Sequence, residues 1–365
     1  MPQANQTSNM FEPEIFLAMV QALEPARGLT LYNQVRKDQT PFPYVQWVVK
    51  YGQFSEMAEY NAPNSKANLV DRQPTKQSAG NAQLAYIREG DYFTPTATLL
   101  LKDVESGNAA AIKPAEQIVA DQVATVNDRI NNRIEWSLWQ ALQGGFEYTG
   151  PNTGPLSIDY GFRSTHKVIL SAADQWDTAD GTGPTIDSMI ATVRSFNQLI
   201  QKDGGVPVTD VFLTKATMDL LVKAWSDASI SAANRAFLTD AQLNEYYSTG
   251  QVTGFMGSST WKTIEQYYDV RQPDGSVVVK PYVPHGTLLV GNLTANNPLK
   301  YVSGPTADFD APRGFIGRYA KNWTEKDPSG RAFLIEEAGL PVLDRPDQFA
   351  TVKVASDAWI AQQTW

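Results

Sequence analysis

The sequence predicts an α+β fold organised around one long helix. Residues 114–142 carry apolar side chains at spacings of three and four, which places those side chains on one face of a helix. From residue 44 to residue 51, apolar side chains recur at every second position, as in a half-buried strand. Later in the chain, helix patterns at residues 186–200 and 217–225 flank a strand pattern at residues 208–213. These three observations together indicate helices and strands that share cores.

Composition limits the classes of protein that the chain can be. The net charge of −9 argues against a protein that reads nucleic acid through a broad basic surface. The absence of cysteine excludes disulfides, thiolate metal sites and cysteine nucleophiles. The first residues lack the basic start and apolar run of a signal peptide, and no apolar run approaches the length that spans a bilayer. We therefore expect a soluble chain made in a cytoplasm.

The helix expected at residues 114–142 has clear ends. Pro114 suits the first helical turn, where its missing N–H would be unpaired anyway. Gly144 and Gly145 follow at the point where a helix would end. The apolar stripe consists of Val119, Val123, Val126, Ile130, Ile134, Leu138 and Leu142. A helix this long with one apolar stripe needs a sheet or another helix along its length.

The segment before this helix contains more chain than it can bury by itself. Residues 11–23 predict a short amphipathic helix, whereas residues 24–43 have little periodicity and suggest an arm lying on other structure. The strand that begins at Tyr44 leads through a turn at residues 61–65 to a return limb at residues 84–87. Because so polar a hairpin cannot bury itself, it is either a flexible excursion or an arm that faces a partner.

The segment after the helix alternates between strands and helices. A hairpin is expected within residues 146–160, and the helix at residues 186–200 should end at the following glycine pair. The remaining strands are expected at residues 208–213, 261–270, 277–283, 287–290, 332–335, 342–343 and 350–354, with a turn at residues 273–275 and a helix at residues 217–225. An apolar run at residues 98–101 precedes the long helix.

The residues that could carry chemistry do not form a recognisable catalytic pattern. His166 and His285 lie in separate regions, and neither belongs to a paired metal-ligand spacing. The sequence contains no G-x-x-x-x-G-K-[ST] phosphate loop and no G-x-S-x-G nucleophile elbow. We therefore predict no catalytic residues, no cofactor and no metal.

Two carboxylate pairs are candidates for an acid and a base. Glu336 and Glu337 are adjacent on an expected strand, so they should point to opposite faces. Asp308 and Asp310 could share a face, but we expect them in a solvated loop. A two-carboxylate glycan-active enzyme that uses distant residues stays as a remote alternative, because the chain has many tryptophans.

The C-terminal third contains a specific succession of motifs. In order, these are PHGTLLVGN at residues 284–292, RYAKNW at 318–323, DP at 327–328, RAF at 331–333, LPVL at 340–343 and PDQF at 346–349. This succession resembles the major capsid proteins of the phage lambda type, the major capsid protein E family. Ala320 stands where that family often has proline, a departure that affects only the local backbone. The tail at residues 356–365 looks like an addition.

The resemblance implies a Hong Kong 97-type phage capsid fold. Its parts would be an N-terminal arm at residues 1–48, an extended loop at 49–93, a peripheral domain at 94–165 with its spine helix, an axial α/β domain at 166–307, and a return to the peripheral domain with a C-terminal tail at 308–365. The polar hairpin then becomes the extended loop, which lies over a neighbouring subunit.

The resemblance also implies the function. We expect a major capsid protein that self-assembles as hexamers and pentamers into the icosahedral head shell of a tailed bacteriophage, around its double-stranded DNA genome. Such a protein is not an enzyme and needs no membrane; it belongs to the virion and is assembled in the cytoplasm of the host bacterium. The expected partners are scaffolding, portal and decoration proteins, and the packaged DNA should be contacted without sequence specificity. An encapsulin-like bacterial nanocompartment shell is the nearest alternative.

The charges on the hairpin suggest how the subunits meet. A concentration of cations on one loop of a net acidic chain predicts pairing with carboxylates on a neighbour's spine helix. The cations are Lys66, Arg72, Lys76 and Arg88, and the carboxylates are those of Asp121 and Asp128.

Overall fold

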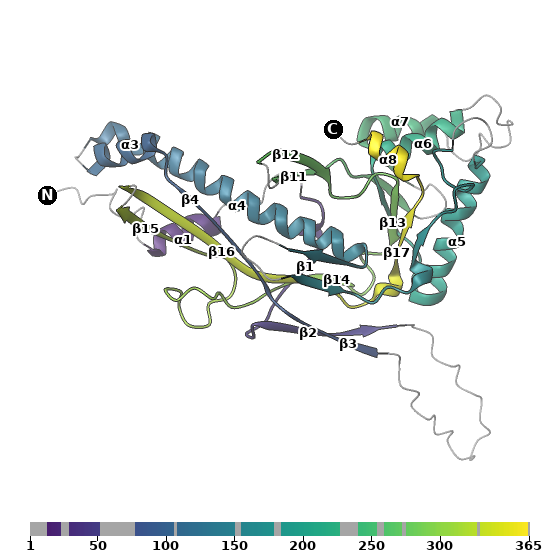
Figure 1. Cartoon of the computed structure of the whole chain (residues 1–365), viewed down its shortest axis with the longest axis horizontal. Helices are drawn as coiled ribbons and strands as arrows, with labels where there is room; N and C mark the ends of the chain where they lie inside the picture. Colours follow the sequence, from purple (N-terminus) through teal and green to yellow (C-terminus); the bar gives the residue numbers. More distant parts are fainter. Residues whose placement is uncertain are drawn as a thin grey trace, which may run out of the picture. The chain divides into compact units, whose positions relative to one another are not determined.

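The computed structural model describes residues 13–22, 29–51, 77–105, 108–149, 155–178, 184–226, 240–253, 259–271, 275–326 and 329–363 (Figure 1). The chain divides into two compact units. The first contains Met1–Gln46, Asn81–Leu138 and Lys300–Val342, and the second contains Trp47–Gly80, Trp139–Leu299 and Leu343–Trp365. Each unit is described by itself below, within the described residues.

A five-stranded sheet forms the centre of the first unit. Its strands are β1 (Arg36–Gln39), β4 (Ala85–Tyr92), β14 (Leu299–Ser303), β15 (Tyr319–Lys326) and β16 (Ser329–Leu343). The order is β1-β14-β16-β15, and β4 also pairs with β16. The partners of β16 include β15 and β4, both antiparallel, whereas β1 and β14 run parallel. Gly339 on β16 is required by the packing, because a Cβ there would lie 2.2 Å from the Tyr301 hydroxyl oxygen.

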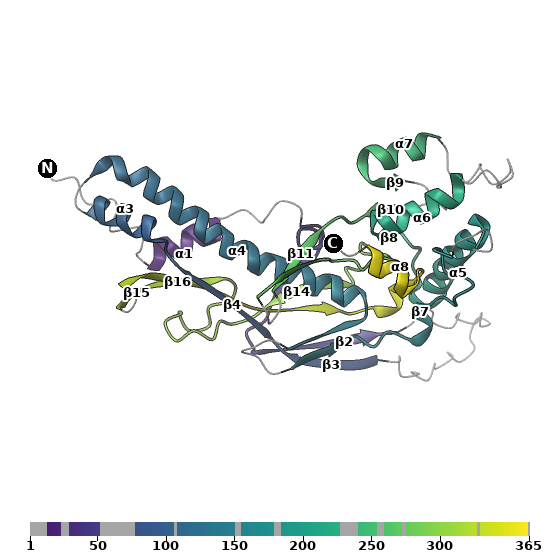
Figure 2. The same ribbon diagram turned by 45° about the horizontal axis from the view of Figure 1, so that its top comes forward.

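The long helix α4 (Ile112–Leu142) confirms the predicted spine. Six positions of its apolar stripe, from Val119 to Leu138, are at most 2% exposed. Within the first unit the helix runs along the sheet, as both views of the ribbon show (Figures 1 and 2). Gly144 and Gly145 adopt positive φ angles of 100° and 145° just beyond its end, a conformation that glycine accepts readily.

Further helical segments of the first unit precede α4. The predicted helix at residues 11–23 is α1 (Pro13–Ala22), which packs on β15 and buries Phe16 against Phe333 with ring centroids 6.1 Å apart. The helix α3 (Pro95–Glu105) includes the apolar run at residues 98–101, for which the sequence predicted no helix. It begins at Thr94, whose hydroxyl accepts the Ala97 N–H at 3.3 Å, and a proline fills its first position. A short turn, η2 (Ala109–Ala111), leads into α4.

The arm is more regular than its sequence suggests. Within residues 24–43, where little structure was expected, the chain forms α2 (Leu31–Gln34) and the strand β1. The reason lies in tertiary contacts: β1 pairs with β14, from Arg36 opposite Lys300 to Gln39 opposite Ser303. Local periodicity cannot report a strand that exists because of a partner more than 250 residues away.

The strands β2 (Tyr44–Lys50) and β3 (Gln77–Gln83) form a two-stranded sheet. Exposed and buried residues alternate strictly along β2, which confirms the predicted pattern. The indole of Trp47 lies over Gly80, where a Cβ would come within 2.2 Å of it. The turn predicted at residues 61–65 lies outside the described residues.

A six-stranded mixed sheet forms the centre of the second unit. In spatial order its strands are β7 (Lys167–Ile169), β17 (Phe349–Lys353), β13 (Thr287–Gly291), β8 (Asp210–Leu213), β10 (Thr260–Thr263) and β9 (Gln251–Thr253). The helices are α5 (Ile186–Gly204), α6 (Lys215–Ser226), α7 (Asp240–Thr249) and α8 (Asp357–Gln362), with short turns at η3 (Ser164–His166) and η5 (Pro346–Gln348).

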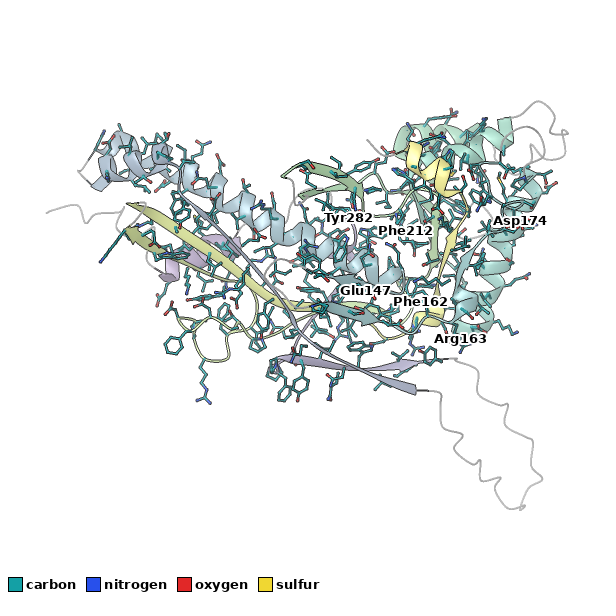
Figure 3. The ribbon with its side chains drawn as sticks, viewed as in Figure 1. Glu147, Phe162, Arg163, Asp174, Phe212 and Tyr282 are labelled. Carbon is teal, nitrogen blue, oxygen red and sulfur yellow. The ribbon has the colours of Figure 1, made fainter. Side chains whose placement is uncertain are left out.

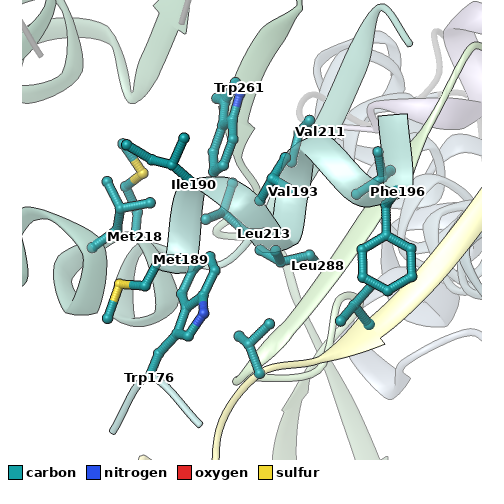
Figure 4. Close-up of a cluster of buried hydrophobic side chains, with 14 of the residues drawn as sticks. Trp176, Met189, Ile190, Val193, Phe196, Val211, Leu213, Met218, Trp261 and Leu288 are labelled. Atoms are coloured by element: carbon teal, nitrogen blue, oxygen red, sulfur yellow. The ribbon is translucent and has the colours of Figure 1, made fainter. Parts of the chain in front are cut away.

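The core of this unit lies between α5, α6 and the sheet (Figure 4). The helix α5 contributes the predicted apolar face, with Met189, Ile190 and Val193 each at most 2% exposed. Its C-terminal end is the one expected, because Gly205 adopts the left-handed conformation at φ 68°. At its start the Thr185 hydroxyl accepts the Ser188 N–H.

Two hairpins complete the second unit, and one prediction needs correction. The strands β5 (Gly145–Tyr148) and β6 (Leu156–Asp159) form the hairpin expected after the spine helix. Residues 261–270, expected to form one strand, form two: β10 pairs with β8, whereas β11 (Tyr267–Arg271) pairs with β12 (Val277–Pro281). The chain leaves the larger sheet at Ile264, which is buried and donates its N–H to the Leu213 carbonyl. The strands expected at residues 332–335 and 342–343 are conversely one continuous strand, β16.

Candidate assembly surfaces

Three of the six residues predicted to join subunits lie within the described residues. Lys66, Arg72 and Lys76 lie outside the described residues. Arg88 lies on β4, and Asp121 and Asp128 lie on α4.

Arg88 is engaged within its own chain. Its Nε lies 2.8 Å from Glu336 Oε2, and its Nη2 lies 3.3 Å from Asp308 Oδ2. The pairing of β4 with β16 places Arg88 directly opposite Glu336, which is completely buried. Because the arginine side chain is still 52% exposed, it can also face a neighbour. A role between subunits stays a prediction.

The two carboxylates on α4 differ in their surroundings. Asp121 is exposed to solvent. Asp128, two helical turns further on, is half-buried, and this burial raises its pKa despite the positive charge of Arg318. Asp121 is therefore the better placed of the two to meet a cation on another molecule.

The arm is held on the spine helix by one buried carboxylate that the sequence did not single out. Glu135 is completely buried on α4 and accepts three backbone N–H groups at the start of α2. The donors are Thr30 at 3.0 Å, Leu31 at 2.9 Å and Tyr32 at 2.7 Å. These N–H groups have no partners inside a helix, so the carboxylate caps α2 from a distant part of the chain.

A buried ion pair lies nearby in the same unit. Arg318 donates to Glu337 Oε2 through Nε at 2.8 Å and Nη2 at 2.5 Å, and its Nη1 donates to the Asn127 side-chain oxygen. Burial tends to lower the pKa of Arg318, but the facing Glu337 outweighs it and raises that pKa. The guanidinium is therefore always charged.

A weak signal in the sequence could have revealed this buried polar row. Asn127, Asn131 and Glu135 follow one another at intervals of four beside the apolar stripe, and all three are at most 2% exposed. Polar residues repeated beside the buried face of a long helix are candidates for contacts to other segments.

The considered carboxylate pairs behave differently from each other. Glu336 and Glu337 belong to separate networks, Glu336 with Arg88 and Glu337 with Arg318, which confirms that they share no site. The expectation for Asp308 was wrong, because it is 9% exposed and binds Lys321 together with Asp310. The lysine lies 11 and 13 residues away on β15, a contact that the loop sequence itself does not reveal.

In the second unit, Arg163 (labelled in Figure 3) is the centre of a second charged cluster. Its Nη1 lies 3.1 Å from Asp203 and its Nη2 lies 2.9 Å from Asp347. The Asp203 carboxylate also lies 3.2 Å from His166 Nε2, while His166 Nδ1 donates to the Phe349 carbonyl at 2.7 Å. Both nitrogens of this buried histidine are thus used to hold the fold.

The other histidine, His285, is also buried and contacts a neighbouring segment of the fold. His285 is 5% exposed, its Nδ1 lies 3.0 Å from the Thr214 hydroxyl, and burial lowers its pKa. Within the described residues, no group of three or more histidine, aspartate or glutamate side chains could hold a metal ion. No helix in that part of the chain is long and apolar enough to cross a membrane.

Large apolar side chains are exposed in both units. In the first unit they are Phe42, Tyr44, Tyr86, Tyr92, Leu99, Phe309 and Trp323, and in the second they are Val48, Ile169, Tyr247, Tyr267, Val277 and Val279. Phe42 and Tyr44 stack with ring centroids 5.5 Å apart. Tyr44 also lines an open cavity of about 330 Å³ between β2 and β3. Aromatic residues exposed in such numbers are typical of surfaces that become interfaces.

Comparisons with known proteins agree with the motifs of the C-terminal third. The family described as phage major capsid protein E matches residues 19–354. The major capsid protein of Escherichia phage N15 is 25% identical over 224 residues, and that of Escherichia phage lambda is 26% identical over 220 residues. Each of these alignments covers 59% of this chain and 60% of the relative, so the chain spans less than two thirds of their length.

The fold has a solved counterpart. The structure of a protein described as a prophage capsid protein of E. coli CFT073 superposes with a TM-score of 0.62 at 14% identity, over 94% of this chain and 99% of that chain. This likeness confirms the predicted Hong Kong 97-type fold. The finer division into arm, loop, peripheral and axial domains stays a prediction.

Proposed function

Because the chain belongs to the phage major capsid protein E family, we propose that it forms the icosahedral head shell of a tailed bacteriophage. The observation that carries this proposal is the family match, which extends over residues 19–354 and so over both units. Many copies would assemble as hexamers and pentamers around double-stranded DNA, first in the cytoplasm of the host bacterium and finally as part of the virion.

The role is structural rather than catalytic. Both histidines are buried with partners that hold the fold, and the adjacent glutamates serve separate ion pairs. The shell closes because the contact surfaces on a subunit differ from one another and meet head to tail. Interfaces of the obligate class, about 2,000 Å² or more in total, would hold such a shell. The exposed apolar side chains of both units supply material for these interfaces.

The extended loop at residues 49–93 would lie over a neighbouring subunit. We assign its cations Lys66, Arg72 and Lys76 to pairing with carboxylates on the neighbour's spine, above all the exposed Asp121. Arg88 would contribute only the part of its guanidinium that Glu336 does not use. Scaffolding, portal and decoration proteins are the further partners. The net charge of −9 would let packaged DNA slide along the wall during filling.

Charge reversal tests the loop contact. A variant with Lys66→Glu, Arg72→Glu and Lys76→Glu should form fewer shells, and those shells should dissociate at lower salt than the parent's, because surface ion pairs are screened by salt. A control variant with Lys202→Glu, Lys215→Glu and Lys280→Glu changes the net charge equally at exposed positions away from the loop. If the loop variant assembles and resists salt as the control does, the pairing is wrong.

Electron microscopy tests the function itself. Expression of the chain with the scaffolding protein of its phage should yield closed, hollow shells of uniform diameter. Particles that instead enclose a cargo enzyme would favour the encapsulin-like alternative. A chain that stays monomeric under these conditions contradicts the proposal.

A further inference from the structure

The loop between β14 and β15 exposes one aromatic side chain completely. Phe309 has a relative exposure of 101%, whereas the next most exposed large apolar residue among those described, Ile169, reaches 70%. The loop lies at residues 304–318 and belongs entirely to the first unit. A single exposed apolar residue is common on protein surfaces, so the exposure of Phe309 matters only together with the order of the loop that carries it.

The residues on both sides of Phe309 are fixed in place. Lys321 Nζ donates to Asp308 Oδ1 at 2.8 Å and to Asp310 Oδ2 at 2.9 Å. The Asp308 carboxylate also accepts the Asp310 N–H at 3.0 Å, which closes a tight turn around the phenylalanine. The two aspartates and Lys321 thus fix the backbone around Phe309, while the ring of Phe309 is exposed to solvent.

The base of the loop is fixed by a buried carboxylate. Glu336 Oε1 accepts the Thr306 hydroxyl at 2.5 Å and the Ala307 N–H at 2.8 Å. Across the loop, the Thr306 N–H donates to the Phe315 carbonyl at 3.1 Å, and Pro305 forms a β-bridge with Ile316. The loop is therefore an ordered platform in the free chain.

We propose that Phe309 is an anchor residue that becomes buried against a second copy of this chain when the shell assembles. This inference rests on the proposed function. Removing an exposed aromatic ring from water is favourable, and a ring on a pre-ordered loop loses little conformational entropy when it docks. Residues that dominate interfaces are typically aromatic side chains seated in a pocket and ringed by polar groups.

The charges around Phe309 favour a protein partner over DNA or a lipid surface. Asp310 is 65% exposed in its side chain and would repel phosphate groups. Lys321, which contacts both flanking aspartates, is already bound by two carboxylates. Arg313 is exposed on the same loop, so the rim of the anchor carries both signs of charge, as the rims of protein interfaces do.

Replacement of the ring tests the anchor. Phe309→Ser should leave the melting temperature of the free subunit unchanged, because the ring is not buried in the free subunit and its removal loses no packing there. The same variant should need about tenfold more protein, or more still, to form shells. Phe309→Leu should restore most of the assembly, and Lys113→Ser, at an exposed position on α4, is the control. Assembly of Phe309→Ser at the parent's concentration overturns the anchor, whereas a parent that forms no shells refutes the proposed function instead.

A chemical measurement tests burial directly. Because the chain has no cysteine, Phe309→Cys introduces a unique thiol. This variant is mixed as a minor component with the parent, so that shells still form, and is treated with a maleimide. The thiol should react rapidly in free subunits and at least about tenfold more slowly in shells. It should react completely once the shells are unfolded in guanidinium. Equal rates in free subunits and shells overturn the proposal.

Discussion

The cap that Glu135 provides for α2 yields the sharpest prediction about the fold. Replacement with alanine removes the acceptor of the three N–H groups of Thr30, Leu31 and Tyr32. The site cannot easily replace the carboxylate with water, since Glu135 and Leu31 are both completely buried. The arm would then lose this attachment to α4, while β1 would still pair with β14.

The expected loss follows from the number and kind of these bonds. A hydrogen bond to a charged acceptor contributes about 1.5–3 kcal/mol, and two of the three donors are only partly buried, so Glu135→Ala should lower the free energy of unfolding by about 3–5 kcal/mol. Glu135→Gln keeps one oxygen for Thr30 and Leu31 but turns an NH₂ group toward the Tyr32 N–H. Its loss should be smaller, about 1–3 kcal/mol.

Urea denaturation of the free subunit measures this difference. Amide hydrogen exchange should in addition show faster exchange at residues 29–39 in the alanine variant, because the arm opens locally before the rest of the unit unfolds. Glu116→Ala is the matched control: it changes an exposed glutamate on the same helix and should shift stability by less than about 0.5 kcal/mol. If Glu135→Ala behaves like the control in both assays, the cap does not hold the arm.

Three further predictions concern other parts of the chain. Arg318→Ala should lower the free energy of unfolding by about 3–5 kcal/mol in urea, because it leaves Glu337 buried without its charge partner, and a loss under about 1 kcal/mol would contradict this. Gly80→Ala should cost about 1–3 kcal/mol in thermal unfolding, since the new Cβ would lie 2.2 Å from the Trp47 indole, and an unchanged melting temperature would refute the contact. Burial tends to raise the pKa of Asp308, but its lysine partner and a backbone N–H outweigh burial and lower it. Its stabilisation should therefore be complete above pH 3.8 and disappear as the pH falls through the lowered pKa, so Asp308→Asn should flatten this part of a stability profile against pH.

Local patterns in the sequence predicted the regular elements well. The spacing along α4 identified the whole stripe from Val119 to Leu138, because one face of a long helix must be apolar when it lies on a sheet. The C-terminal end of α5 was equally predictable, since Gly205 supplies the left-handed residue that stops a helix. The alternation along β2 predicted which of its side chains are buried.

Long-range polar contacts could not be predicted in the same way. Nothing near Glu135 in the sequence announces that its partners are backbone N–H groups more than 100 residues earlier. Asp308 looked like a solvated loop residue because its lysine partner lies on the following strand. The strand β1 exists only through its pairing with β14, so its own residues carry no clear pattern. Contacts between subunits are still harder to predict, because a single chain shows only one of the two surfaces that meet in each contact.

Cryo-electron microscopy of assembled shells tests the central claim most directly. We expect a closed shell in which residues 49–93 of each subunit lie over a neighbouring copy and residues 308–310 contact another subunit. A shell in which the hairpin folds back onto its own subunit, or a preparation that contains only monomers, would contradict the claim that this chain is completed by copies of itself.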